Sequence, residues 1–310
     1  MRRNIFYLLG AIACFLANVP TAFASGLWNY TYDSNNDSIA GNGFGGLRIG
    51  GTGYEVYGTG YKIDNNSFIF GVSTNLPREG RYTGPSLGNF SIENNSIALG
   101  DLLLNFKGVS LDGANGELLG IRFVPTNDAG VGGTGLFARV TAISKAGENA
   151  GWRLAPWRDT VQSRGGNPTH GALSANDSYF GGNPYVPTVI GGGVKLADIT
   201  LLDAFGLLQE GFNTGMFGGS QIFGFKLDRS FLPEGSFIAS LFYECFNDGT
   251  AFFGNVPPVS SIGFPISNMP IVSDPLPARP VPVPAAFLGI AAAGLFGGKK
   301  LLQRKQQVKA

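Results

Sequence analysis

The stretch that decides the fold is QIFGFKLDRSFLPEGSFIASLFYECF, residues 221–246. Two runs of apolar and aromatic residues, 221–227 and 237–246, flank a turn signal at Pro233, Glu234 and Gly235. Short runs bounded by Pro and Gly are typical of β-strands. We therefore predict two strands joined by a turn.

The same pattern extends outward from this stretch. Glycine accounts for 48 of the 310 residues, and Asn, Ser and Thr separate short aromatic or β-branched runs. Further strands are predicted at 101–111 and at 118–124. Strands are also predicted where the following side chains fall on alternate residues, which places each set on one face: Trp28, Tyr30 and Tyr32; Tyr54 and Val56; Phe68 and Phe70; and Phe137, Arg139 and Thr141. We expect the last of these faces, with Phe137, Arg139 and Thr141, to be on the solvent side. Only 201–208 allows a short helix. The absence of intervening amphipathic helices favours an antiparallel, jelly-roll-like β-sandwich.

Residues 150–187 interrupt this pattern, and we expect a loop-rich insertion there. Trp152 and Trp157 lie among its glycines and prolines. Exposed tryptophans in a loop would stack on the apolar faces of sugar rings and bind carbohydrate. Large aromatics are more often buried, so we favour the alternative that both cover the edge of the core.

The N-terminus has the layout of a secretory signal peptide. Arg2 and Arg3 precede a mostly apolar stretch, 5–19, and Ala22 and Ala24 form an A-x-A site before Ser25. We expect the secretion machinery to export the chain and cleavage to leave a mature protein that begins at Ser25.

The C-terminus carries a second membrane signal. A Pro-rich linker, 266–280, leads into a motif formed by Val281, Pro282, Val283, Pro284 and Ala285. Residues 281–298 carry no charge and are just long enough for a membrane-spanning helix. Five basic residues and no acidic residue follow, so the positive-inside rule leaves the end in the cytoplasm and the body outside. We therefore divide the chain into a signal peptide (1–24), a body (25–265), a Pro-rich linker (266–280) and a C-terminal sorting signal (281–310).

The tail resembles the PEP-CTERM sorting signal of bacterial surface proteins. That signal also combines a short Pro-containing motif, an apolar helix and a basic cluster, although Pro282-Val283-Pro284 stands here in place of Pro-Glu-Pro. Segments 28–33 (WNYTYD), 53–58 (GYEVYG) and 244–249 (ECFNDG) also look like parts of such proteins. The resemblance implies processing by an exosortase, a membrane cysteine transpeptidase-like enzyme. Proteins of this group have no established activity, so the resemblance implies none for the body.

Charge and cysteine content narrow the possible partners. Of 22 basic residues, two lie in the leader and five follow Gly298, whereas all 21 acidic residues lie between, so the body has a formal charge of −6. Such a body is unsuited to nucleic acid, which requires concentrated Lys and Arg. Only Cys245 remains after cleavage, so the body has no internal disulfide.

The strongest candidate for ion binding is the segment DSNND, 33–37. Asp33, Asn35 and Asp37 place oxygen ligands on alternate residues, as calcium loops do, and acidic or amide pairs recur, for example at Asn247-Asp248. The alternative is that these residues only form turns, which Asn and Asp favour. We expect no cofactor other than this structural calcium.

Two motifs could suggest enzymatic chemistry. Residues 84–88 (GPSLG) match the elbow of serine hydrolases, with Ser86 as nucleophile and His170 as base, but strand and turn residues follow where the elbow requires a helix. Residues 41–46 (GNGFGG) fit a dinucleotide motif on paper, yet no helix signal follows them. A single histidine also excludes a histidine-rich zinc site.

The sequence therefore predicts a non-enzymatic exported protein. It would be tethered to the inner membrane and then passed to the cell surface or extracellular matrix, where extracellular polysaccharide is a possible partner. The alternatives are a carbohydrate-binding module that uses Trp152 and Trp157, and a secreted hydrolase that uses Ser86 and His170.

Overall fold

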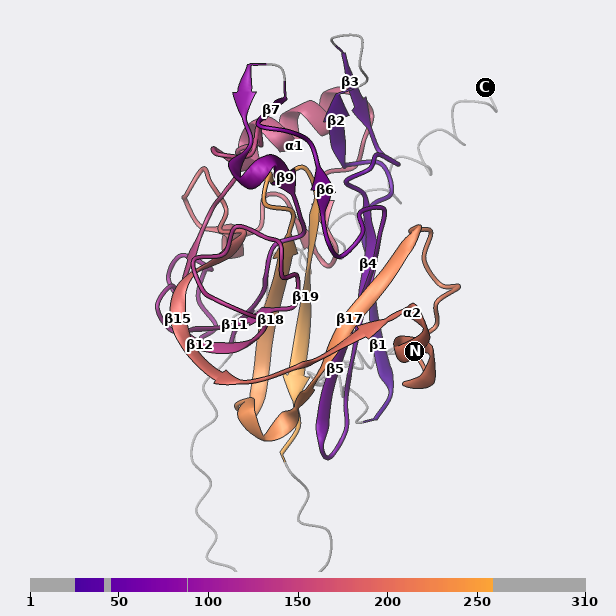
Figure 1. Cartoon of the computed structure of the whole chain (residues 1–310), viewed down its shortest axis with the longest axis vertical. Helices are drawn as coiled ribbons and strands as arrows, with labels where there is room; N and C mark the ends of the chain where they lie inside the picture. The colour runs from indigo at the N-terminus through magenta and orange to yellow at the C-terminus, as the bar shows by residue number, and fades with distance from the viewer. Residues whose placement is uncertain (1–25, 42–45, 88, 259–310) are drawn as a thin grey trace, which may run out of the picture. The chain divides into compact units, whose positions relative to one another are not determined.

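The computed structural model describes residues 26–41, 46–87 and 89–258 (Figure 1). The predicted leader, cleavage site, linker, sorting motif and membrane helix lie outside these residues. Within the described ranges, no helix is both long and apolar enough to cross a membrane.

The described chain is mainly β, as predicted, and its two large sheets are antiparallel throughout (Figure 1). The five-stranded sheet has the order β1 (Trp28–Tyr32), β4 (Val56–Ile63), β5 (Ser67–Thr74), β17 (Gln221–Asp228), β16 (Thr200–Asp203). The six-stranded sheet has the order β15 (Val189–Ala197), β12 (Gly135–Ile143), β11 (Leu118–Arg122), β10 (Leu102–Asn105), β18 (Gly235–Phe242), β19 (Gly249–Val256).

Short elements complete the described structure. Four two-stranded pairs are β2 (Ile39–Gly41) with β3 (Leu47–Ile49), β6 (Arg81–Tyr82) with β9 (Ser96–Ile97), β7 (Ser86–Leu87) with β8 (Phe90–Ser91), and β13 (Thr169–His170) with β14 (Leu173–Ser174). The α-helices are α1 (Leu154–Ser163) and α2 (Ala204–Gln209), and the 3₁₀ helices are η1 (Glu93–Asn95), η2 (Ser178–Phe180) and η3 (Arg229–Phe231).

The two strands predicted within 221–246 are present, but they belong to different sheets. β17 pairs with β5, where Phe225 lies opposite Phe70, and β18 pairs with β19, where Ala239 lies opposite Phe252. The intervening residues, which include η3, carry the chain from one sheet to the other. This crossing brings the inner faces of the two sheets into one core.

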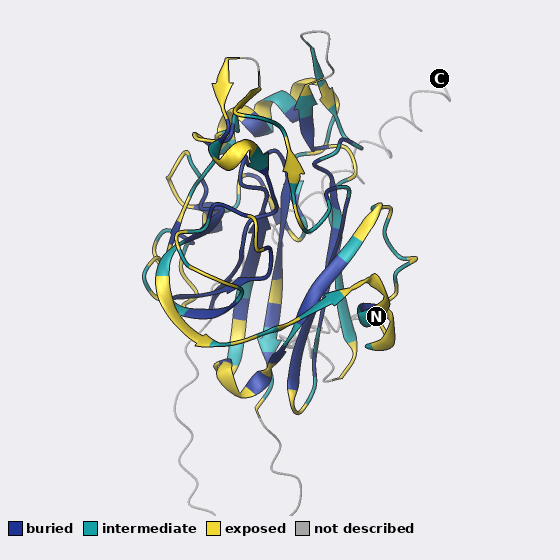
Figure 2. Cartoon of the chain, viewed as in Figure 1, coloured by how far each residue is buried: buried dark blue, intermediate teal, exposed yellow. Residues whose placement is uncertain are grey.

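Aromatic side chains from both sheets fill that core. Tyr61 and Phe70 of the five-stranded sheet stack on Phe252 of the six-stranded sheet, with ring centroids 5.4 and 6.0 Å apart. Figure 2 shows the facing strands as mostly buried. Because a fully buried large apolar side chain contributes about 1.5–3 kcal/mol, these rings are a main source of stability.

The expectation of a loop-rich insertion at 150–187 is wrong in part, because the region contains α1. Pro156 lies in the first turn of this helix, where a proline costs no intrahelical hydrogen bond. Trp157 and Val161, four residues apart, form the buried face. Both belong to a second core, which also includes Phe137 and Val140 of the six-stranded sheet. The insertion therefore contributes a hydrophobic layer of its own.

Phe137 was predicted on the solvent side, and that prediction is also wrong. It is 3 % exposed and packs in the second core, whereas Arg139 and Thr141 are exposed as expected. The pairing of β12 with β15 shifts register between Ala138 and Thr141, and Arg139 has a φ of 51°. This bulge breaks the alternation on which the prediction was based.

Residues 201–208 divide between a strand and a helix. β16 ends at Asp203, whose side chain accepts a hydrogen bond from Gly206 N at 2.8 Å and so caps α2. Leu207 of this helix and Phe212 cover Ile69 on the outer face of the five-stranded sheet. Trp28 and Tyr30 pack against Phe212 on that face, as their alternation predicted.

Candidate metal centre

Three carboxylates from distant parts of the chain converge beside the five-stranded sheet. Asp33 and Asp37 lie in the connection between β1 and β2, and Asp248 immediately precedes β19. One carboxylate oxygen from each lies within 4.8 Å of the other two, and Asp37 and Asp248 are fully buried. We call Asp33, Asp37 and Asp248 the acidic triad.

Backbone amides from β4 and from the β13–β14 hairpin hold the triad in place. Asp248 Oδ2 accepts a hydrogen bond from Val56 N at 2.8 Å, Asp37 Oδ2 accepts one from Thr169 N at 3.3 Å, and Asp33 Oδ1 accepts one from Gly171 N. Gly171 has a φ of +57°, and a Cβ there would lie 2.4 Å from Thr250 Oγ1. This donor therefore requires glycine, and the triad geometry is set by the backbone.

Each anchored aspartate of the β1–β2 connection leaves its second oxygen without a partner. Asp33 Oδ2 and Asp37 Oδ1 are buried and accept no hydrogen bond from the described residues. Glu55, also fully buried, repeats the pattern: Oε2 accepts from Ser38 Oγ at 2.6 Å and from Gly51 N, while Oε1 has no described partner. A buried carboxylate oxygen without a hydrogen bond is costly, so these atoms require another partner.

Burial and mutual repulsion raise the pKa values of these groups. Burial, and next the charge of Glu55, raise the pKa of Asp37 to about 9. Burial and then the charge of Asp37 hold the pKa values of Asp33 and Asp248 well above their ordinary range. Arg48 partly offsets this effect at Glu55, but no described Lys or Arg forms an ion pair with the four carboxylates. Near neutral pH the group must therefore take up protons or bind a cation.

The donor set fits a hard divalent cation. All of the triad's ligand atoms are carboxylate oxygens, which calcium and magnesium prefer, whereas zinc sites use His and Cys. Calcium–oxygen distances of about 2.3–2.6 Å place ligands on opposite sides of the ion about 5 Å apart, while the corresponding separation for magnesium is about 4.2 Å. The three triad oxygens lie within 4.8 Å of one another, so all three can coordinate a single hard cation of this class.

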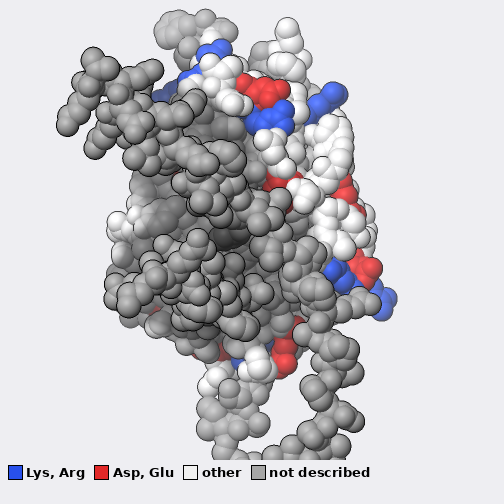
Figure 3. Space-filling model, turned by 180° about the vertical axis from the view of Figure 1, so that it is seen from behind, with Lys and Arg blue, Asp and Glu red and all other residues white. Residues whose placement is uncertain are grey.

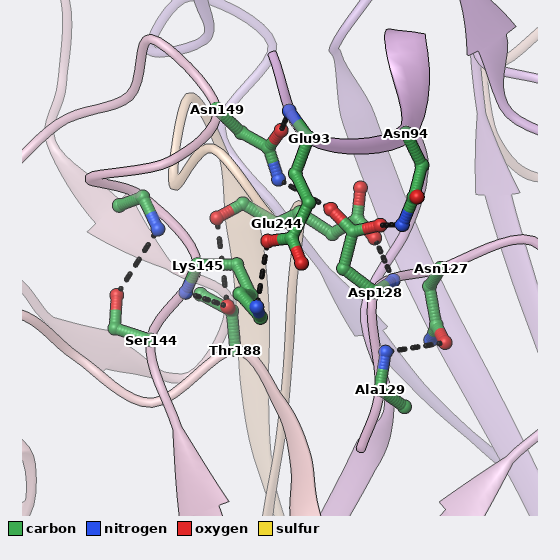
Figure 4. A network of polar contacts seen from close by, with 11 residues as sticks. Glu93, Asn94, Asn127, Asp128, Ala129, Ser144, Lys145, Asn149, Thr188 and Glu244 are labelled. Atoms are coloured by element: carbon green, nitrogen blue, oxygen red, sulfur yellow. Dashed lines mark hydrogen bonds and ion pairs between the residues drawn. The ribbon is translucent and has the colours of Figure 1, made fainter. Parts of the chain in front are cut away.

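A second group of buried acids provides a contrast within the same protein (Figure 4). Glu244 accepts hydrogen bonds from Ala98 N at 2.9 Å and from Asp128 N. Asp128 in turn accepts from Asn94 Nδ2 at 2.6 Å and from Asn149 Nδ2 at 2.8 Å. In this network both oxygens of each acid have a donor.

The contrast shows what distinguishes the triad. Burial, and next the charge of Asp128, raise the pKa of Glu244 to about 8, so raised pKa values are common to both sites. Among the described residues, only the triad aspartates Asp33 and Asp37 and the neighbouring Glu55 keep a buried carboxylate oxygen free of described donors. Unsatisfied oxygen atoms, and not acidity alone, therefore mark the triad as the candidate metal centre.

The structure brings together only part of the predicted calcium loop. Asp33 and Asp37 lie in the triad, and Asn35 between them is exposed. Asp248 and Glu55 were not predicted as ligands. The recurrence of acidic and amide pairs includes Asn247-Asp248, but it does not indicate which pair meets the β1–β2 connection.

The structure contradicts a carbohydrate-stacking role for Trp157. The side chain has no exposed surface, its Nε1 donates to Asn247 O at 3.0 Å, and its ring stacks on His170 with centroids 4.4 Å apart. Trp157 instead ties α1 to the residue beside Asp248. Trp152 is half-buried and packs against the same second core.

Ser86 and His170 do not form a catalytic pair. Ser86 is exposed in β7, which is followed by β8 and not by a helix. His170 is fully buried, donates from Nδ1 to Gly249 O at 3.2 Å, and has no described partner at Nε2. Burial lowers the pKa of His170 to about 3 and raises the pKa of Cys245 to about 12.

Surface charges are arranged differently from the buried acids. On the described part of the face shown in Figure 3, acidic and basic side chains lie near one another among uncharged residues. Exposed pairs such as Lys195–Asp198, at 2.6 Å, contribute at most about 1 kcal/mol. The electrostatic interactions that affect stability most are therefore those of the buried carboxylates.

No family model, curated protein or solved structure matches this chain.

Proposed function

We propose that this chain is a non-enzymatic, exported surface or extracellular-matrix protein whose body is completed by a bound calcium ion. The observation that carries the proposal is the acidic triad with Glu55, where anchored carboxylates keep buried oxygens free of described donors. A cation there would join the β1–β2 connection to the segment before β19, which are over 200 residues apart in the chain. We propose a β-sandwich related to the jelly roll as the architecture.

Export and calcium binding support each other. Oxygen-ligated sites of extracellular modules bind calcium with dissociation constants of about 10⁻⁴–10⁻³ M, which suits millimolar calcium outside cells. The A-x-A site before Ser25 and the basic residues after 281–298 support export of the body. The site would fill after translocation, and the cation would stabilise the body where it acts.

The tail supports surface sorting. We propose that the inner membrane holds the precursor through 281–298 and that an exosortase-like enzyme recognises the motif around Pro282-Val283-Pro284. The cleaved body would then pass to the cell surface.

Intact-mass measurement of the protein recovered from its producing cells tests this proposal. We expect a chain that begins at Ser25 and lacks the residues that follow the sorting motif. Deletion of 281–310 should move the body from the membrane fraction to the periplasm or medium. An uncleaved N-terminus, or unchanged fractionation after the deletion, would refute the export and sorting proposal.

A further inference from the structure

A groove of about 530 Å³ lies beside the triad, and Asp33 contributes to both. Its walls include Tyr32, Tyr57 and Phe217, together with the exposed amides Asn35 and Asn167. This volume falls within the range of small-molecule sites, about 300–1,000 Å³. The groove therefore has room for a small ligand, and its surface is both aromatic and polar.

The aromatic walls are held in place by their surroundings. The rings of Tyr32 and Phe217 meet edge to face with centroids 5.1 Å apart, and Tyr57 Oη accepts a hydrogen bond from Asn75 Nδ2 at 3.2 Å. A Cβ at Gly58 would lie 2.3 Å from Phe217 Cε1, so this ring rests directly on the backbone of β4. Tyr32 nevertheless remains 58 % exposed. The aromatic side chains of the groove are thus held in place, and the ring of Tyr32 is accessible to a ligand.

Polar groups in the groove are available to a ligand. Asn36 Oδ1 accepts from Ser34 Oγ at 2.7 Å and from Asn167 N at 3.0 Å, which fixes the loop. The side-chain amides of Asn35 and Asn167 make no hydrogen bond to the described residues. Each can donate and accept at the same time, as a hydroxyl group requires of its partner.

We propose that this groove binds a neutral saccharide. One face of a sugar ring carries C–H groups that would pack on Tyr32, and its hydroxyls would pair with Asn35 and Asn167. The described residues that line the groove include one acid, Asp33, and no Lys, Arg or His, so no side chain of the lining offers a basic partner to the carboxylate of an acidic sugar. The proposal rests on the proposed function in one respect, because the triad cation would fix the loop that forms the polar wall.

Calorimetric titration of the calcium-loaded full chain tests this inference. The probes are neutral tetrasaccharides of β-1,4-linked glucose, β-1,4-linked mannose and α-1,4-linked glucose. At least one should bind with one site per chain. Tyr32→Ala and Asn35→Ala, both at exposed positions, should each weaken that binding by roughly tenfold or more. Tyr82→Ala is the matched control, because Tyr82 is 77 % exposed but does not line the groove.

The results separate this inference from the proposed function. Failure of all three saccharides to bind, or equal binding by wild type and both groove variants, would overturn the saccharide site. Calcium binding is measured on the same samples by its effect on melting temperature. Calcium stabilisation without saccharide binding would refute only the groove proposal, whereas saccharide binding that calcium does not affect would refute the role given to the cation.

Discussion

Asp37→Asn should change the stability of the body in opposite directions with and without calcium. Asp37 Oδ2 accepts a hydrogen bond from Thr169 N, and the side-chain oxygen of asparagine can keep this bond. The substitution therefore mainly removes the carboxylate charge and the buried oxygen Oδ1, which has no described partner. Without calcium, folding near pH 8 requires Asp37 to take up a proton, because its pKa rises to about 9 in the folded state. Asparagine removes this cost, so the free energy of unfolding should rise. With calcium, the loss of a ligand should lower it.

The magnitude follows from linkage. A site with a dissociation constant of about 10⁻⁴ M gains about 2.7 kcal/mol at a hundredfold higher calcium concentration. For a body of this size that gain corresponds to about 5–11 °C in melting temperature. Asp37→Asn should lose most of this increment.

The pH dependence provides a second test of the same site. The pKa of Asp37 is raised in the folded state to about 9 from an ordinary value of 3.8. An acid whose pKa is raised on folding stabilises the folded state when it is protonated. This contribution to the free energy of unfolding is complete below about pH 4 and is lost as the pH rises through about 9. In a chelator the wild type should therefore lose stability across this window, and the increment due to calcium should grow with pH.

Thermal unfolding in calcium and in chelator, for wild type and Asp37→Asn, is the assay. Glu244→Gln is the matched control, because both oxygens of Glu244 already accept hydrogen bonds. It should be destabilised by about 1–3 kcal/mol equally in both buffers. An equal calcium increment in wild type and Asp37→Asn, or an Asp37→Asn variant that is less stable than wild type in chelator at pH 8, would refute the reasoning.

Two further predictions concern the second core and the thiol. Trp157→Ala should cost about 3–5 kcal/mol in urea unfolding, because a fully buried indole is removed, whereas a change below about 1 kcal/mol would contradict the role of α1 as a packed layer. Cys245 should not react with a disulfide reagent in the native protein, because the thiol is buried and its pKa is raised to about 12. It should react once the protein unfolds. Rapid labelling of the native protein would contradict this and show that the core around Cys245 opens.

The sequence predicts the strands well where alternation is regular. Trp28, Tyr30 and Tyr32 form one face of β1, and 221–246 contains β17 and β18. Alternation does not reveal that these last two strands lie in different sheets, because pairing depends on partners elsewhere in the chain. The bulge at Arg139 and the helix that begins just before Pro156 are local exceptions to the pattern.

The candidate site could be predicted only in part for the same reason. Asp33 and Asp37 are near each other in the sequence, and their oxygen-rich spacing indicates an ion site. Asp248 and Glu55 reach that site through β19 and the start of β4, so their role depends on the arrangement of the two sheets. Trp157 likewise appears as a loop tryptophan in the sequence, although tertiary packing buries it completely.

Native mass spectrometry of the full chain in calcium tests the metal centre most directly, because it counts bound ions. We expect one calcium per wild-type chain and none in the Asp33→Asn, Asp37→Asn double variant. A wild type that binds no calcium at millimolar concentration, or a double variant that keeps the ion, would contradict it.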